Sequence, residues 1–160
     1  MSWQARLADA PDTDRLGQQL AATLPKSAVV FLRGDLGAGK TSLARALLRG
    51  LGVAGPVKSP TYTLIERYPL PGGDAVHLDL YRIAAESELE FLGLADLLPE
   101  ARLWLVEWPD HGLRALPPPD LEVALTVAHE GRLVRIHGAT TAGRQWLQAL
   151  AAHADLGTAS

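Results

Sequence analysis

The sequence contains no cysteine and no asparagine, and each absence excludes a class of protein. A chain without cysteine can form no disulfide bond, no thiolate-bound zinc site and no cysteine nucleophile, and a reducing cytoplasm is its natural compartment. A chain without asparagine cannot carry the Asn-Lys-x-Asp loop by which GTPases read guanine. The five histidines lie far apart in the sequence, and none pairs at the spacing of metal ligands.

Long apolar runs and a basic region are also missing. The longest continuous apolar run, residues 28–32, is far shorter than the roughly 20 residues that a membrane helix needs, and residues 1–7 lack the apolar core of a signal peptide. We therefore predict a cytoplasmic protein without membrane contact. The three lysines and twelve arginines are scattered, the formal net charge is −3 and the isoelectric point is about 5.9, so direct binding to RNA or DNA is not expected.

The composition is that of a globular chain, because 48% of the 160 residues are hydrophobic and 21% are charged. We predict one domain over residues 1–153 and a disordered tail over residues 154–160. Apolar runs and alternation predict strands at 28–33, 61–68, 75–81, 103–107, 121–128 and 133–137. Helices are predicted at 13–24 with Thr13 as the cap, at 41–51, as one or two short helices within 86–98, and at 141–153. This order predicts a three-layer α/β domain with a mixed, partly parallel sheet and a C-terminal hairpin plus helix.

Residues 34–41 read GDLGAGKT and match the phosphate-binding loop pattern G-x-x-x-x-G-K-[ST] at every fixed position. The surroundings also match, because a buried strand precedes the loop and an amphipathic helix follows it. Glycines allow backbone N–H groups to surround an anion, and the following helix directs its positive dipole end at the phosphates. Lys40 suits the β- and γ-phosphate oxygens and the Thr41 hydroxyl suits Mg²⁺, so a nucleotide is the predicted ligand.

A phosphate-loop enzyme needs an acid near its metal ion, and two carboxylates compete for that place. Asp79 lies in the alternating segment 76–80, and Glu107 follows the more buried-looking run 103–106. The pattern favours Glu107 as the strand-end acid, but either side chain can reach the metal through water. Both stay candidates, and an exposed strand-end carboxylate is the plain alternative for each.

Hydroxyl side chains gather between the loop helix and the strand that carries Asp79. Ser59, Thr61 and Thr63 occur within five residues, where a switch segment would sense the γ-phosphate. An ordinary loop leading into a strand explains the same residues equally well, so a switch-like role is a hypothesis at this point.

Five sequence blocks in this order resemble the TsaE family, also called YjeE, the ATPase component of the bacterial machinery that makes tRNA threonylcarbamoyladenosine. The phosphate loop alone is shared by many families, whereas five blocks at this spacing are far more specific. The resemblance extends from about residue 13 to residue 144. The blocks are 34–41 (GDLGAGKT), 57–64 (VKSPTYTL), 77–82 (HLDLYR), 88–94 (ELEFLGL) and 106–109 (VEWP).

The resemblance implies a compact P-loop fold that hydrolyses ATP weakly when alone, with Mg²⁺ as cofactor. It also implies two partners, the threonylcarbamoyl transferase subunit and its dimerising homologue, with tRNA reached only through them. ATP binding and hydrolysis would reset that complex between turnovers. An acidic chain without a basic stripe agrees with indirect contact to tRNA.

Site residues carry over from the resemblance by motif position. Lys40, Asp79 and Glu107 would be catalytic, with Asp79 as the Walker-B-type acid, and Thr41 and Glu107 would contact Mg²⁺. Weaker local matches place Thr13 and Arg132 near the adenine. The phosphates would be contacted by Leu36, Gly37, Ala38, Gly39, Lys40 and Thr41.

Two other functions stay open on the residues alone. A small-molecule P-loop kinase fits the size of the chain, but such a kinase needs an acceptor pocket and an arginine-bearing lid, and only Arg82 offers a candidate. A nucleotide-gated assembly module, in which hydrolysis is incidental, is the other alternative. The transfer of phosphate to a small molecule would identify the kinase, and function without hydrolysis would identify the module.

Overall fold

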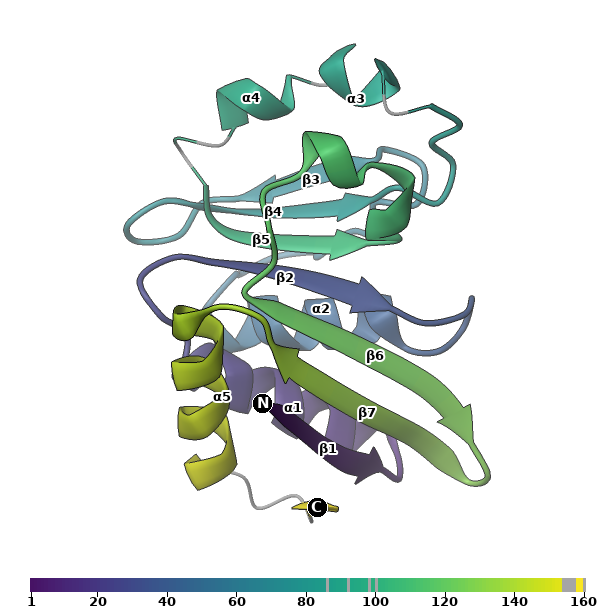
Figure 1. The fold of residues 1–160 in the computed structure, drawn as a ribbon, viewed down its shortest axis with the longest axis vertical. Coiled ribbons are helices and arrows are strands. Elements are labelled where there is room, and N and C mark those ends of the chain that lie inside the picture. Colours follow the sequence, from purple (N-terminus) through teal and green to yellow (C-terminus); the bar gives the residue numbers. More distant parts are fainter. Residues whose placement is uncertain (86, 92, 98, 100, 154–157, 160) are drawn as a thin grey trace.

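The computed structural model of the chain describes residues 1–85, 87–91, 93–97, 99, 101–153 and 158–159, which form one mixed sheet with helices on both faces (Figure 1). The first half contains β1 (Ser2–Leu7), α1 (Ala10–Ala22), β2 (Ala28–Arg33), α2 (Lys40–Gly50), β3 (Ile65–Tyr68) and β4 (Asp74–Asp79). The second half contains α3 (Ser87–Phe91), α4 (Leu94–Leu97), β5 (Ala101–Glu107), the 3-10 turns η1 (Pro109–His111) and η2 (Leu113–Ala115), β6 (Leu121–Ala128), β7 (Gly131–Gly138), α5 (Thr141–His153) and β8 (Thr158–Ala159).

The sheet is parallel in its centre and antiparallel at its edges. Its strand order is β3-β4-β5-β2-β6-β7-β1-β8, and β4, β5, β2 and β6 run parallel to one another. The hairpin β6–β7 and the helix α5 complete the C-terminal half. The predicted α/β fold with a mixed, partly parallel sheet is therefore confirmed. Because β2, β4 and β5 end at the same edge, the residues that follow them meet there.

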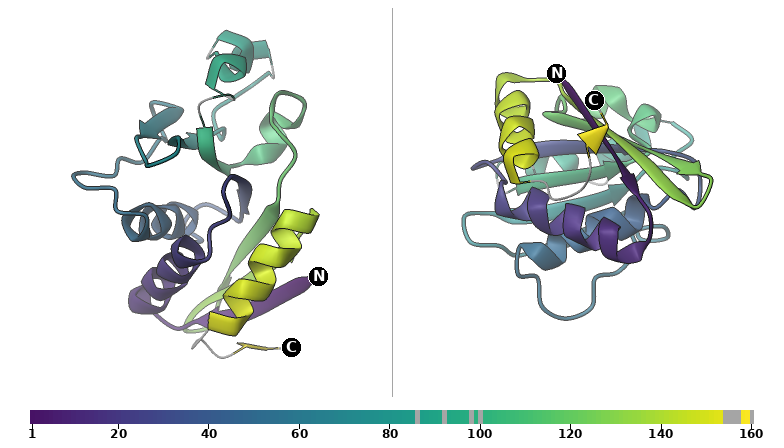
Figure 2. Two further views of the ribbon diagram at one scale, coloured as in Figure 1. Left: turned by 90° about the vertical axis from the view of Figure 1, so that its left-hand side faces the viewer. Right: turned by 90° about the horizontal axis from the view of Figure 1, so that it is seen from below.

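Two hydrophobic cores lie on opposite faces of the sheet. On β2, Val30 and Leu32 face the larger core, which α1, α2 and α5 cover, whereas Phe31 faces the smaller core with residues of α3 and α4. Figure 2 shows α1 and α2 together on one side of the sheet. Alternation along β4 and β5 puts His77, Asp79 and Glu107 on the side of α2.

The close packing of α1 on α2 depends on Gly17. A Cβ atom at this position would lie 2.4 Å from Ala46 Cβ and 2.7 Å from the Ala46 backbone carbonyl carbon. Only a residue without a side chain allows this approach, because a gap of that size accommodates no additional carbon. The contact fixes α1 beside the helix that begins at the phosphate loop.

Several predicted boundaries are wrong at the N-terminal side of an element. Asp9, and not Thr13, caps α1, because its carboxylate accepts a hydrogen bond of 3.1 Å from the Asp12 backbone N–H. The strand predicted at 61–68 begins only at Ile65, since the Leu64 N–H donates to Pro60 O (2.8 Å) and Leu64 has a positive φ of 69°. Strand β1 was not predicted at all.

The predictions for the helical segment and the tail fall partly outside the described residues. Helices α3 and α4 confirm two short helices within 86–98, although residues 86, 92 and 98 are not described. In the tail, Thr158–Ala159 pairs with β1, and residues 154–157 and 160 lie outside the described part, so the disordered tail stays a prediction. None of the described helices is both long and apolar enough to cross a membrane.

Candidate functional site

The phosphate loop connects the end of β2 to the start of α2. Gly39 precedes the helix with a φ of 105°, a left-handed conformation that glycine adopts without strain. Within the described residues no side chain caps this helix, and its first turn contains no acid. The N–H groups of the first turn therefore present an uncompensated positive end, which is the physical basis of anion binding at such a loop.

Lys40 lies over this loop and is almost completely buried. Its Nζ donates hydrogen bonds to the carbonyl oxygens of Gly34 (2.6 Å) and Asp35 (2.9 Å) and lies 4.6 Å from the ring centre of Trp108. Burial lowers the pKa of Lys40, while the negative charges of Glu107, Asp79 and Asp35 oppose that shift. The ammonium group is thus held by weak carbonyl and aromatic partners that a phosphate can replace.

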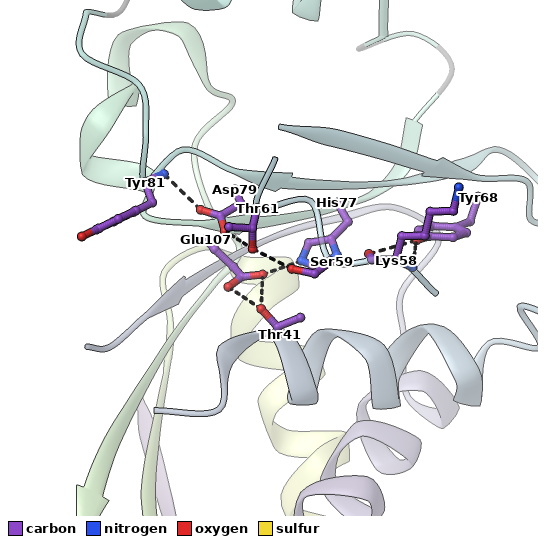
Figure 3. A network of polar contacts seen from close by, with 9 residues as sticks. All are labelled: Thr41, Lys58, Ser59, Thr61, Tyr68, His77, Asp79, Tyr81 and Glu107. Atoms are coloured by element: carbon purple, nitrogen blue, oxygen red, sulfur yellow. Dashed lines mark hydrogen bonds and ion pairs between the residues drawn. The ribbon is translucent and has the colours of Figure 1, made fainter. Parts of the chain in front are cut away.

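Glu107 and Asp79 end neighbouring parallel strands and are paired in register. Both carboxylates are buried, at 2% and 6% exposure. The Thr41 hydroxyl lies 2.9 Å from Glu107 Oε1 and 3.0 Å from Oε2. Figure 3 draws both contacts as dashed lines. Asp79 instead accepts a hydrogen bond from the Tyr81 backbone N–H at 3.0 Å and lies 3.5 Å from the Thr61 hydroxyl. The loop hydroxyl therefore contacts Glu107, the acid that the strand pattern favours.

Two cavities meet at the start of α2. One, of about 310 Å³, is lined by Leu36, Lys40, Thr41, Asp79 and Glu107 among others. The other, of about 560 Å³, is lined by residues of α1, α2 and the β6–β7 turn, including Thr13, Arg45 and Arg132. Gly39 and Ser42 line both cavities. The combined space has a polar, acid-lined end beside Lys40 and a second compartment on the side of α1.

Comparison with known proteins identifies the family of this chain. The model of the family described as "Threonylcarbamoyl adenosine biosynthesis protein TsaE" matches residues 7–151. The chain belongs to the TsaE family. The tRNA threonylcarbamoyladenosine biosynthesis protein TsaE of Haemophilus influenzae is 40% identical over 140 residues, which cover 84% of this chain and 89% of that protein. The resemblance found in the five sequence blocks is thereby confirmed.

Further relatives support the TsaE assignment. The TsaE protein of Aquifex aeolicus is 37% identical over 129 residues, covering 79% of this chain and 89% of its own. The crystal structure of Bacillus subtilis YdiB superposes with a TM-score of 0.77 at 25% identity, covering 96% of this chain and 95% of that one. The fold of this chain is therefore similar to that of a solved structure over nearly its whole length.

The structure brings most of the predicted TsaE site residues together. Thr13 and Arg132 both line the larger cavity. Arg132 also donates to the carbonyl oxygens of Ala38 (3.1 Å) and Gly37 (3.2 Å), so it contacts the phosphate loop itself. Ala38 packs in the larger hydrophobic core, and its backbone N–H donates to Asp35 O at 3.0 Å.

The switch-like residues divide into two groups. Ser59 and Thr61 share a hydrogen bond of 2.7 Å between their hydroxyl oxygens, and Thr61 reaches Asp79. Thr63 instead donates to Glu66 Oε1 at 2.9 Å. The structure therefore links the first two hydroxyls to Asp79, and it pairs Thr63 with Glu66, which lines neither cavity.

His77 is a site residue that sequence reasoning missed. Its side chain is fully buried, and its Nε2 lies 2.7 Å from Glu107 Oε2. In the sequence it is one of five scattered histidines, yet it stands two residues before Asp79 in a strand, so both side chains share a face. The His-x-Asp spacing within an alternating strand was the available signal.

Asp79 makes the nucleotide-free fold sensitive to pH. Burial raises the pKa of the Asp79 carboxyl, and the charge of Glu107 adds to this, while the Tyr81 N–H, His77 and Lys40 oppose it. The folded chain then binds the Asp79 proton more tightly than the unfolded chain, so stability falls as the pH rises through the folded pKa. We expect Asp79→Asn to raise the unfolding midpoint by a few degrees at pH 7, and the gain to shrink toward zero near pH 4.

Thermal unfolding at pH 7, 5.5 and 4 measures this effect. The exposed acid Asp14 provides the control, since Asp14→Asn is expected to leave the midpoint unchanged at each pH. An Asp79→Asn midpoint equal to or below that of the parent at pH 7 would contradict the expectation.

Proposed function

We propose that this chain is a magnesium-dependent ATPase whose cycle of ATP binding and hydrolysis resets the threonylcarbamoyl transferase complex between turnovers. Membership of the TsaE family gives the chain a role in tRNA threonylcarbamoyladenosine biosynthesis. The observation that carries the ATPase proposal is the Thr41–Glu107 contact of 2.9 Å beside the uncapped start of α2. A hydroxyl and a carboxylate so placed beside an anion site are a suitable pair for a nucleotide-bound cation.

The donor chemistry of the site fits Mg²⁺. Among the described residues, no group of three or more His, Asp or Glu side chains is arranged to hold a metal ion alone. Mg²⁺ is commonly bound by one or two protein oxygens together with phosphate and water, and Thr41 and Glu107 supply oxygens of this kind. When bound, the ion would neutralise charge on the phosphate oxygens.

The remaining groups have separate tasks in the proposed hydrolysis. Lys40 exchanges its carbonyl partners for phosphate oxygens and stabilises the negative charge that develops during transfer. Asp79, with its raised pKa and its place in the same cavity, accepts a hydrogen bond from the attacking water and orients it. The larger cavity takes the adenosine, bounded by Thr13 and Arg132.

The proposed partners are the threonylcarbamoyl transferase subunit and its dimerising homologue, and tRNA is reached only through them. The net charge of −3 supports indirect contact, because a chain that holds RNA by itself needs a concentration of positive charge. ATP turnover by the chain alone is then slow, and assembly with the partners accelerates it.

The test measures the rate of ATP turnover and the number of tRNA modification turnovers. It uses the purified chain, both partner proteins and tRNA. ATP turnover is expected to be slow for the chain alone and to rise at least about tenfold with the partner pair. Modification should continue for many turnovers with ATP and stop after about one turnover with a non-hydrolysable analogue. Many turnovers with the analogue would overturn the resetting role in favour of an assembly module, and phosphate found on a small molecule would favour a kinase.

A further inference from the structure

Within the described residues, His77 makes one side-chain hydrogen bond, to an acid of the candidate site. It belongs to β4, its side chain is fully inaccessible, and its Nε2 lies 2.7 Å from Glu107 Oε2. Its Nδ1 is buried and has no hydrogen-bond partner among those residues. Burial of an imidazole with one nitrogen unpaired is costly, and such a cost is tolerated where the other nitrogen performs a task.

The contact determines which nitrogen of His77 carries hydrogen. A carboxylate oxygen accepts hydrogen bonds, so Nε2 must donate to Glu107 Oε2. The opposite tautomer would direct a lone pair of Nε2 at the carboxylate, and no carboxylate is adjacent to Nδ1 to compensate. The Nε2–H form is therefore the one that this geometry supports.

Glu107 is held from two sides, by His77 from β4 and by Thr41 from α2 (Figure 3). The Thr41 hydroxyl has a single hydrogen to share between two carboxylate oxygens at 2.9 and 3.0 Å. When that hydroxyl turns to a cation, the His77 contact is the one that continues to orient Glu107. The imidazole is suited to this because it is rigid and enclosed by the sheet.

We propose that His77 is a positioning residue that fixes the Glu107 carboxylate toward Thr41 and so sets the affinity of the site for a divalent cation. The proposal rests on the proposed function, because it assumes that the site takes Mg²⁺ with a nucleotide. It assigns no contact between His77 and the nucleotide, the metal or water. Contacts of this kind behind a metal ligand commonly change metal affinity by 10- to 100-fold.

Two amide variants of His77 distinguish the loss of the hydrogen bond to Glu107 from the loss of the imidazole ring itself. In His77→Gln the side-chain amide nitrogen is as far from the backbone, counted in bonds, as Nε2, so it can donate to Glu107. In His77→Asn the amide ends at the level of Nδ1 and falls short. Val76→Ala is the control for stability, since Val76 lies on the same strand but is buried in the opposite core.

The readout is the affinity for a fluorescent adenine nucleotide, measured in EDTA and across a Mg²⁺ titration. We expect His77→Asn to raise the Mg²⁺ concentration for half-maximal tightening at least tenfold, and His77→Gln to stay within about threefold of the parent. Affinity in EDTA should stay unchanged in both variants, and Val76→Ala should lower the unfolding midpoint without shifting the Mg²⁺ titration. Equal titrations for the parent and His77→Asn, or equal losses for the two amides, would overturn the proposal.

Measurements on the parent chain distinguish a failure of the proposed function from a failure of the proposed role of His77. If nucleotide binding by the parent does not tighten with Mg²⁺, the proposed function itself fails and the role of His77 fails with it. If His77→Asn does not fold, long-range ¹H–¹⁵N spectra of the parent decide, because the five histidines give few ring signals. The Nε2–H tautomer for His77 is expected, and the Nδ1–H tautomer would overturn the proposal.

Discussion

Lys40→Ala is expected to lower ATP turnover by about 100-fold or more, both alone and with the partner proteins. The Lys40 ammonium contacts the phosphate loop at Gly34 O and Asp35 O, and a preorganised charge at developing negative charge contributes about that much to the rate. Nucleotide affinity should fall more for ATP than for ADP, because the lysine reaches the terminal phosphate oxygens of a triphosphate. Phosphate release and nucleotide titrations measure the two effects.

The control for Lys40→Ala is the removal of a lysine elsewhere. Lys26 is exposed and lies just before β2, so Lys26→Ala changes the net charge equally and is expected to keep the parent turnover. Lys40→Ala also leaves the carbonyl groups of Gly34 and Asp35 without their donor, so its unfolding midpoint is measured beside its activity. A well-folded Lys40→Ala protein that supports modification at the parent rate would contradict the proposed function.

The elements that sequence patterns located well are those with strong local signals. The predicted strands 28–33 and 121–128 and the helix 141–153 have the observed boundaries. A continuous apolar run, a strict alternation and a periodic helix face each describe burial that depends on neighbours close in the sequence. The phosphate loop is similar, since its function is carried by eight consecutive residues.

The elements that were missed depend on contacts distant in the sequence. Strand β1 is short and pairs with β7, more than 120 residues away, so its alternating Trp3, Ala5 and Leu7 are buried by a partner that no local window contains. The start of β3 was wrong because the threonines near residue 62 favour a strand, whereas the turn from Pro60 to Leu64 closes first. Tertiary pairing and turn geometry outweighed propensity in both places.

In the candidate site, too, local sequence patterns predicted some features, and contacts between distant segments determine the others. The acids Asp79 and Glu107 were recognised because each ends an apolar strand, but only the parallel pairing of β4 and β5 brings them opposite each other. Their different partners were not recognised from sequence. Thr41 reaches Glu107 only because the fold brings the start of α2 to the end of β5, whereas the Tyr81 N–H bonds to Asp79 in a local turn two residues along the chain. The choice between the two acids is therefore a question for mutation.

Glu107→Gln and Asp79→Asn are expected to fail in different ways. Glu107→Gln removes the charge that faces Thr41, so the tightening of nucleotide binding by Mg²⁺ should weaken at least tenfold and turnover should fall about 100-fold or more. Asp79→Asn replaces the charged carboxylate proposed to accept a hydrogen bond from the attacking water by a neutral amide, so turnover should also fall about 100-fold. Its Mg²⁺ titration should stay within about threefold of the parent, because Asp79 is bonded to the Tyr81 N–H rather than to Thr41.

The comparison is decisive because both variants are isosteric and both original acids are buried. Nucleotide affinity in EDTA is measured for each variant, and we expect it to match the parent, which separates loss of cation binding from damage to the phosphate loop. A Mg²⁺ titration shifted by Asp79→Asn and unchanged by Glu107→Gln would exchange the two roles. In that case Asp79 would be the acid nearest the cation, and the Thr41–Glu107 contact would belong only to the nucleotide-free state.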